Sequence, residues 1–201
     1  ASVSDAAPAK RAPHHARAPS CRAQAATVIG AINTLTRAAD GRLLADNTDW
    51  VGIRNLLAAG LRQRHGGAAP AELCALVLGA GGTARAACHA LRQLGAAQLY
   101  VFNRTREKAE ALGAAFDAVP LSGDLDAAVG GLPQLHLLVS CIPGSAGVAP
   151  ADALLRRHSP VVLDAAYRPR DTPLLAAARR AGCTAFEGAS QTAAPLARSL
   201  P

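Results

Sequence analysis

Short apolar runs alternate with amphipathic stretches along most of the chain after residue 70. The runs predict strands, and the stretches, whose apolar residues recur every three or four positions, predict helices. Strands are expected at 73–78, 98–102, 116–120, 135–140, 161–165 and 183–187, and helices at 82–94, 105–114, 150–157 and 173–181. Strands and helices that alternate in this way form a parallel sheet covered on both faces. The pattern therefore predicts an α/β fold with a doubly wound parallel sheet over residues 69–188.

A different pattern precedes this region. Its expected elements are, in chain order, a strand at 28–37, a turn at Asp40-Gly41, a strand at 42–46, the polar cluster Asn47-Thr48-Asp49, an amphipathic helix at 50–64 and a linker at 66–70. Two strands joined by an Asp-Gly turn are typical of a hairpin. We expect residues 24–68 to form a unit of their own, which this helix connects to the sheet.

The two ends of the chain show neither pattern. Residues 1–23 are rich in alanine, proline, arginine and serine without periodicity, which predicts a disordered tail. Residues 189–201 are expected to form an irregular C-terminal tail. The chain does not begin with methionine, and it lacks an apolar signal-peptide segment. A fragment or a processed form is therefore expected.

Composition narrows the class of protein. No apolar run is long enough to cross a bilayer, so no membrane contact is expected. The five cysteines are far apart and lack the spacing of a zinc site or a disulfide framework, so we expect no metal and a cytoplasmic protein with reduced thiols. The net charge of +7 falls partly in the tail, which has no aromatic residues to stack on bases. A nucleic-acid partner is therefore not expected.

A glycine-rich loop follows the first strand of the alternating region. It consists of Gly79, Ala80, Gly81, Gly82, Thr83 and Ala84, in the pattern G-x-G-x-x-A, and a helix is expected directly after it. In a Rossmann domain the first glycine permits a tight turn, the second lets a pyrophosphate approach the backbone, and the small last residue packs helix on strand. The helix N-terminus attracts the phosphates. The alternative is a glycine-rich turn without a ligand.

The end of the next strand bears on the choice of dinucleotide. An NAD-specific Rossmann domain usually has Asp or Glu here to bind the ribose 2′-hydroxyl. This chain has Asn103, Arg104 and Thr105 instead, with Lys108 just beyond. A guanidinium suits a 2′-phosphate, which an acidic residue would repel. The sequence thus favours NADP, and the alternative is that Arg104 and Lys108 are the solvated start of a helix.

Several motifs together resemble the shikimate and quinate dehydrogenase family, and most of all the shikimate dehydrogenase module at the end of the fungal pentafunctional arom polypeptide. The matching pieces are Gly30-Ala31-Ile32-Asn33-Thr34, Asp46-Asn47-Thr48-Asp49, the glycine loop, Asn103-Arg104-Thr105, Cys141-Ile142-Pro143 and Leu163-Asp164-Ala165-Ala166-Tyr167. The resemblance implies an NADP-dependent enzyme of the shikimate pathway, which reduces 3-dehydroshikimate to shikimate. It also implies that residues 24–68 are the remnant of an N-terminal α/β substrate domain.

The resemblance implies a role for each polar motif. Asn33 and Asp49 would bind substrate hydroxyls, and Asp49 would form half of a Lys–Asp pair that exchanges the alcohol proton. Thr48 would position the loop, and Tyr167 would lie near the substrate. Cys141, Ile142 and Pro143 would lie on the nicotinamide side of the cofactor. The alternative for the residues before the helix at 50–64 is an ordinary N-cap.

The chain departs from the family pattern in two places. The family's catalytic lysine lies in the N-terminal substrate domain, before the Asn-Thr motif. The lysines of this chain are Lys108, which follows that motif, and Lys10, which lies in the tail without the family's surrounding sequence. The substrate-binding glutamine expected near the C-terminus is also missing, because Gln191 comes too early. We therefore expect an incomplete chain that binds NADP(H) but turns over shikimate poorly or not at all.

Other functions also fit parts of the sequence. The alternatives are a catalytically inactive regulator of the quinate-repressor kind, a quinate dehydrogenase and a different Rossmann oxidoreductase such as glutamyl-tRNA reductase. The last of these shares the glycine loop and Asn-Arg-Thr but does not account for Asp46 to Asp49. The sequence does not decide between shikimate and quinate, and it leaves the oligomeric state open.

Overall fold

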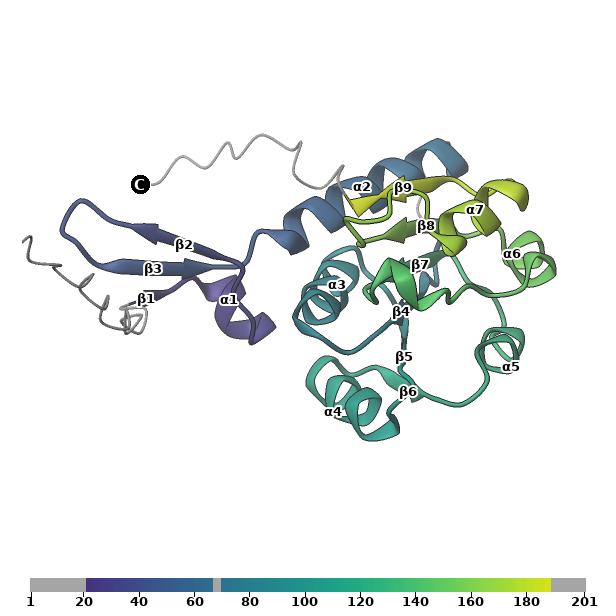
Figure 1. Ribbon diagram of the computed structural model, residues 1–201, viewed down its shortest axis with the longest axis horizontal. Helices are drawn as coiled ribbons and strands as arrows, with labels where there is room; N and C mark the ends of the chain where they lie inside the picture. The colour runs from purple at the N-terminus through teal and green to yellow at the C-terminus, as the bar shows by residue number, and fades with distance from the viewer. Residues whose placement is uncertain (1–20, 67–69, 189–201) are drawn as a thin grey trace, which may run out of the picture.

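A six-stranded parallel sheet forms the centre of the larger part of the protein (Figure 1). The computed structural model describes residues 21–66 and 70–188. The strands run in the spatial order β6-β5-β4-β7-β8-β9. Their bounds are β4 (Cys74–Leu78), β5 (Gln98–Phe102), β6 (Val119–Leu121), β7 (Leu137–Ser140), β8 (Val161–Asp164) and β9 (Ala185–Glu187). The strand order reverses between β4 and its neighbours β5 and β7, as in a doubly wound sheet, so the predicted Rossmann fold is confirmed.

Helices cover both faces of this sheet. One layer consists of α2 (Asp49–His65), α3 (Gly82–Gln93) and α4 (Arg106–Phe116), and the other of α5 (Leu125–Gly130), α6 (Asp152–His158) and α7 (Pro173–Arg180). Side chains of β4 alternate between the two layers: Ala75 and Val77 pack with the first, Leu76 and Leu78 with the second. All five residues of β4 are buried, which agrees with the continuous apolar run expected of a central parallel strand.

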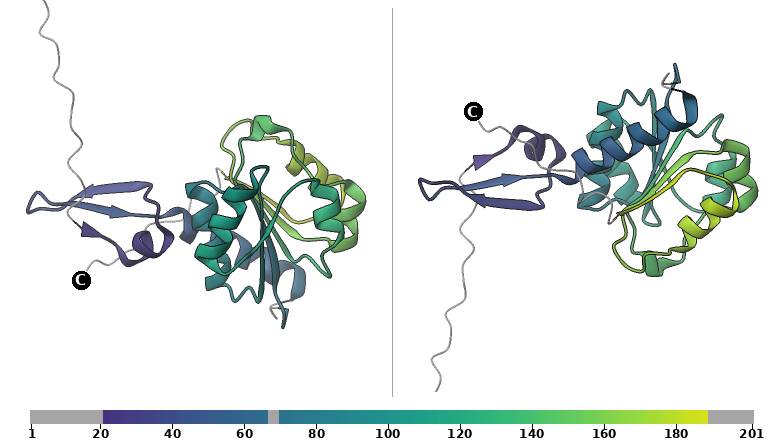
Figure 2. Two further views of the ribbon diagram at one scale, coloured as in Figure 1. Left: turned by 90° about the horizontal axis from the view of Figure 1, so that it is seen from below. Right: turned by 90° about the horizontal axis from the view of Figure 1, so that it is seen from above.

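A smaller unit projects from this body (Figure 2). It contains β1 (Cys21–Arg22), α1 (Gln24–Ile29), β2 (Thr34–Arg37) and β3 (Leu43–Asp46), with the strands in the order β1-β3-β2. Strands β2 and β3 form the expected antiparallel hairpin, and Gly41 in its turn has a φ of 83°. The long helix α2 leads from this unit into the body, and α1 also contacts α3.

The strand predicted at 28–37 is wrong in its first half. Residues up to Ile29 belong to α1, which buries Ala26 and Ile29 on one face and ends at Gly30 in a left-handed conformation with a φ of 69°. The β-branched residues of this segment favoured a strand. Burial of these two residues, three positions apart on one helix face, stabilises a helix instead, and the strand begins only at Thr34.

Other boundaries shift for similar reasons. Cys21 and Arg22, assigned to the tail by the sequence, form β1 by parallel pairing with β3, a long-range contact that local composition does not encode. Helix α4 continues to Phe116, so the strand expected at 116–120 begins only at Val119. Helix α5 and the short 3-10 helix Gly144–Ala146 were not predicted. Residues 1–20 and 189–201 lie outside the described residues.

None of the helices in the described ranges is long and apolar enough to span a membrane. Within the same ranges, no cluster of three or more histidine, cysteine, aspartate or glutamate side chains could hold a metal ion. The cysteines described there, Cys74, Cys88, Cys141 and Cys183, are free thiols.

Candidate active site

The glycine loop lies at the carboxyl end of the central strand β4. Gly79 has a φ of 106°, a region that residues with a side chain rarely adopt. Its N–H donates to the carbonyl oxygen of Phe102 at 2.8 Å, which fixes the turn to the neighbouring strand. A Cβ at this position would lie 3.1 Å from Cγ2 of Ile142. Both the conformation and the close approach therefore require glycine here.

The next part of the loop faces open space. Gly81 is the N-cap of α3, and a Cβ built there would meet nothing within 4 Å. Ala84 is fully buried behind the loop, where its small side chain lets α3 pack on the sheet. The loop and the start of α3 thus present backbone N–H groups to a free surface. That arrangement fits the pyrophosphate of a dinucleotide.

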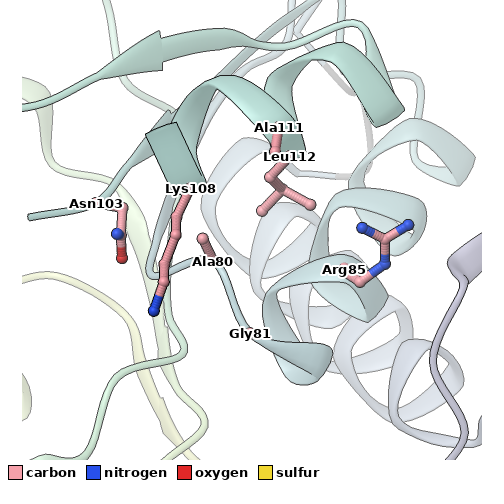
Figure 3. A pocket seen from close by; sticks show the side chains of 7 residues that line it. All are labelled: Ala80, Gly81, Arg85, Asn103, Lys108, Ala111 and Leu112. Carbon is pink, nitrogen blue, oxygen red and sulfur yellow. The ribbon is translucent and has the colours of Figure 1, made fainter. Parts of the chain in front are cut away.

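A pocket of about 310 Å³ adjoins the loop (Figure 3). Its lining comprises Ala80, Gly81, Arg85, Asn103, Lys108, Ala111 and Leu112. In Figure 3, Asn103 and Lys108 lie at one end of the pocket and Arg85 at the other. Asn103 donates from Nδ2 to the carbonyl of Thr105 at 2.9 Å, so this amide orders the turn between β5 and α4. Lys108 is exposed and adds a positive charge to the open side of the pocket.

A second pocket of about 420 Å³ lies at the carboxyl ends of the same strands. Arg104 lines it together with mostly apolar residues: Leu78, Gly79, Phe102, Asn103, Ile142, Pro143, Ala146 and Val148. A mostly apolar pocket that includes a guanidinium suits a stacked aromatic base. Ile142 and Pro143 therefore share a pocket with the residue predicted to hold the adenosine phosphate, and their expected place beside the nicotinamide stays a prediction.

The predicted substrate residues come together in one hydrogen-bonded cluster. Asn33 donates from Nδ2 to Oδ1 of Asp49 at 2.7 Å, and its Oδ1 accepts the backbone N–H of Thr48 at 2.9 Å. Thr34 donates its hydroxyl to Oδ1 of Asn33 at 2.9 Å and lies 3.2 Å from the hydroxyl of Thr48. We call these four residues, Asn33, Thr34, Thr48 and Asp49, the Asn33–Asp49 cluster. It leaves Asn33 exposed and the carboxylate of Asp49 partly accessible.

The N-cap alternative for these residues does not account for the structure. Thr48 is the N-cap of α2 by position, but its side chain makes no capping hydrogen bond, because the hydroxyl faces Asn33 and Thr34. Asn47 is 2% exposed and donates from Nδ2 to the carbonyl of Ala31 at 3.2 Å. Its side chain holds the preceding loop in place and does not cap the helix.

The cluster and the glycine loop are neighbours. A Cβ at Gly82, the first residue of α3, would lie 3.6 Å from Cβ of Ala31, two residues before Asn33. Cys141, which follows β7, packs against the same core. Burial raises the pKa of its thiol, and the carboxylates Asp164 and Asp49 raise it further.

A buried carboxylate organises the loop that carries Tyr167. Asp164, at the end of β8, is 2% exposed. It accepts the Ala166 N–H at 3.0 Å and the Thr172 hydroxyl at 2.7 Å. Tyr167 itself is 58% exposed, and its approach to a substrate stays a prediction.

Three residues of this region carried no predicted role. Arg85 lines the first pocket, and Asp164 and Thr172 fix the loop after β8. A polar residue at the end of an apolar strand was a usable signal for Asp164, because parallel strands deliver their carboxyl-end residues to the ligand edge of the sheet. Nothing local in the sequence distinguishes Arg85 from the other arginines.

A family model and curated relatives indicate the same family for this chain. A family model described as shikimate / quinate 5-dehydrogenase matches residues 64–172. A pentafunctional AROM polypeptide from Komagataella phaffii is 37% identical over 173 residues, which cover 80% of this chain and 11% of that protein. A shikimate dehydrogenase (NADP(+)) from Rhodospirillum rubrum is 41% identical, over 80% of this chain and 58% of the relative.

Solved structures agree. The crystal structure of a shikimate 5-dehydrogenase from Thermus thermophilus, in complex with NADP(H) and shikimate, superposes with a TM-score of 0.68 at 30% identity. The match covers 87% of this chain and 62% of that one. The present chain therefore spans less than two thirds of the relatives and the solved structure that it resembles.

Proposed function

This chain belongs to the shikimate/quinate 5-dehydrogenase family, and from that premise we propose that it binds NADP(H) and serves the reversible reduction of 3-dehydroshikimate to shikimate. The observation that carries the proposal is the 2.7 Å hydrogen bond between Asn33 and Asp49. It joins two residues that lie 16 positions apart, and Ala31, two residues before Asn33, lies near Gly82 of the glycine loop.

The residues of the cluster fit recognition of a polyhydroxylated ring. Asn33 presents an amide that is exposed on one side and held by Thr34 and Thr48 on the other. Asp49 offers a carboxylate that can accept from a substrate hydroxyl and take or return its proton. NADPH, when bound, would supply the hydride that goes to the carbonyl carbon, while the carbonyl oxygen takes up a proton. In this chain the proton would come from the carboxyl group of Asp49, which returns to a carboxylate as the product hydroxyl forms.

The cofactor pocket favours a 2′-phosphate. Arg104 lines the second pocket and Lys108 lines the first, and Asn103 contributes to both. Two cations, one just after β5 and one in the first turn of α4, would each make a charge-assisted contact with a dianionic phosphate. A ribose 2′-hydroxyl gains little from them, and no carboxylate follows β5 directly to accept from it. We therefore propose NADP(H) as the dinucleotide, in preference to NAD(H).

Cofactor titrations test this proposal. We expect Lys108→Gln and Arg104→Gln each to weaken NADPH binding about tenfold, since a charged hydrogen bond contributes about 1.5–3 kcal/mol. Both variants should leave the weaker NADH binding nearly unchanged. Arg106→Gln is the matched control, because Arg106 lies on the same exposed turn but pairs with Glu110 at 2.8 Å. Equal losses for NADPH and NADH, or a loss in the control, would contradict the assignment.

The turnover of this chain is a separate question. Lys108 belongs to the cofactor pocket, so among the described residues no lysine stands beside Asp49. We expect NADPH binding together with slow or absent oxidation of NADPH by 3-dehydroshikimate, and Asp49→Asn should remove any residual rate. Rapid turnover by this chain would contradict the expectation.

A further inference from the structure

Arg85 connects the cofactor side of the protein with the smaller unit. It lies in the first turn of α3, directly after Ala84 of the glycine loop. Its Nε donates to the carbonyl oxygen of Ile29 at 2.5 Å, at the C-terminal end of α1. A guanidinium at this end of a helix meets carbonyl groups that lack partners within the helix and carry partial negative charge.

The guanidinium is held in one orientation by its surroundings. It lies over the ring of Phe116 from α4, with 5.4 Å between the guanidinium carbon and the ring centroid. A Cβ at Gly30 would lie 2.7 Å from Nη2 of Arg85, so a side chain there would push the guanidinium out of its present position. Arg85 therefore bridges three helices, α1, α3 and α4, and a flexible ammonium could not replace both its stacking and its hydrogen bond.

The segment that begins at Ile29 ends at the cluster. We call residues 29–33 the 29–33 turn. Arg85 holds its first carbonyl, Ala31 in its middle packs near Gly82, and Asn47 donates to the Ala31 carbonyl. Asn33 is its last residue and binds Asp49. Because only three residues separate Ile29 from Asn33, a displacement of α3 relative to α1 would also displace Asn33.

We infer that Arg85 is a positioning residue, which couples occupancy of the glycine loop to the geometry of the Asn33–Asp49 cluster. The inference rests on the proposed cofactor function. An anion bound at the N-terminus of α3 restrains the turn of helix from which Arg85 projects. Arg85 passes that restraint to Ile29 and so to Asn33. Coupling of this kind is reciprocal, so a ligand at the cluster would also tighten cofactor binding.

Hydrogen–deuterium exchange of this chain with and without NADPH tests the coupling. In the wild-type chain we expect saturating NADPH to slow exchange about fivefold or more both at the glycine loop and at the 29–33 turn with Thr48. In Arg85→Lys the charge remains, so protection at the loop should persist while protection at the turn is lost. Arg85→Gln is a second variant, with weaker NADPH binding compensated by a higher cofactor concentration.

Arg92→Lys is the matched control. Arg92 lies on the same helix and also donates to backbone carbonyls, those of Phe116 at 3.1 Å and Ala96 at 2.7 Å, but these carbonyls lie outside α1. We expect this variant to retain protection at both sites. A purely structural role of Arg85 would raise exchange at the turn equally with and without NADPH, and would leave the ratio unchanged.

The outcomes separate the inference from the proposed function. Protection at the glycine loop but not at the 29–33 turn of the wild-type chain would overturn the inference and leave cofactor binding in place. Undiminished protection at the turn in both Arg85 variants would also overturn it. An absence of protection anywhere in the wild-type chain would overturn both the inference and the proposed cofactor.

Discussion

At the scale of single residues, buried polar side chains fix the loops around the candidate site. Asp164 is a carboxylate with almost no contact with water, and its oxygens accept from a backbone N–H and from the Thr172 hydroxyl. The Thr172 oxygen in turn accepts the backbone N–H of Leu175 at 3.2 Å, as the N-cap of α7. One hydroxyl therefore satisfies a helix end and a buried charge together.

Replacement of this hydroxyl should be costly. Thr172→Val keeps the shape of the side chain but removes the cap and leaves one oxygen of Asp164 without its donor. We expect a loss of about 2–3 kcal/mol in the free energy of unfolding, measured by urea denaturation. Thr105→Val is the control, because Thr105 is the N-cap of α4 without a side-chain capping bond. Similar losses in both variants would contradict this account of Thr172.

At the scale of helices and strands, close packing on the sheet sets the position of α2, the helix that joins the smaller unit to the body. Gly60 faces the sheet, and a Cβ there would lie 2.5 Å from Cγ1 of Val161 and 2.9 Å from the ring of Phe186. The helix backbone thus approaches β8 and β9 more closely than any other residue would allow. Because α2 begins at Asp49, this contact also determines how the Asn33–Asp49 cluster stands relative to the sheet.

Gly60→Ala should therefore destabilise the protein in spite of the higher helix propensity of alanine. Overpacking of this kind costs about 1–3 kcal/mol, against a gain of about 1 kcal/mol from propensity. We expect a lower thermal midpoint for this variant. Gly130→Ala in α5 is the control, since its nearest neighbour, Cδ2 of Leu154, would lie at an ordinary 3.7 Å. A stabilised Gly60→Ala variant would refute the close contact.

At the scale of the whole molecule, two histidines hold the amino ends of the parallel strands, on the side opposite the glycine loop. Nδ1 of His136 accepts the N–H of Cys74 at 3.0 Å, at the start of β4. Nδ1 of His158 accepts the N–H of Leu135 at 3.2 Å, just before β7. Burial lowers the pKa of both imidazoles. His65 and Arg64 lower the pKa of His136 further, and Arg157 lowers that of His158. Both groups must be neutral to accept these bonds.

The stability of the protein should consequently fall in mild acid. In the unfolded chain a histidine takes up a proton near pH 6.5, whereas in the native state it does so only at lower pH. The unfolded state therefore binds more protons below about pH 6.5, and the free energy of unfolding decreases as the pH falls through this range. His136→Asn keeps an acceptor at a similar position without titrating. It should flatten the pH dependence of denaturant midpoints, and an unaltered slope would argue against His136.

The sequence by itself determined the Rossmann fold and the cofactor loop. Alternating apolar runs and helical periodicity are local properties, so β5 was located at its observed bounds and β4 within one residue. The need for glycine at Gly79 is also local, because it follows from a backbone conformation, and the observed φ of 106° agrees with it. The motifs sufficed to indicate the family, although the roles of individual site residues stay predictions.

Tertiary structure alone decided how the motifs are joined. The bond from Nδ2 of Asn33 to the Thr48 hydroxyl, which keeps that hydroxyl from capping α2, spans 15 residues, and the bond from Arg85 to Ile29 spans 56. Pairing with β3 made a strand of Cys21–Arg22, and burial of Ala26 and Ile29 made a helix where β-branched residues favoured a strand. Such contacts depend on which surfaces the folded chain brings together. Local propensity is too small to oppose them, so it could not reveal that the 29–33 turn, which ends at the Asn33–Asp49 cluster, packs beside the glycine loop.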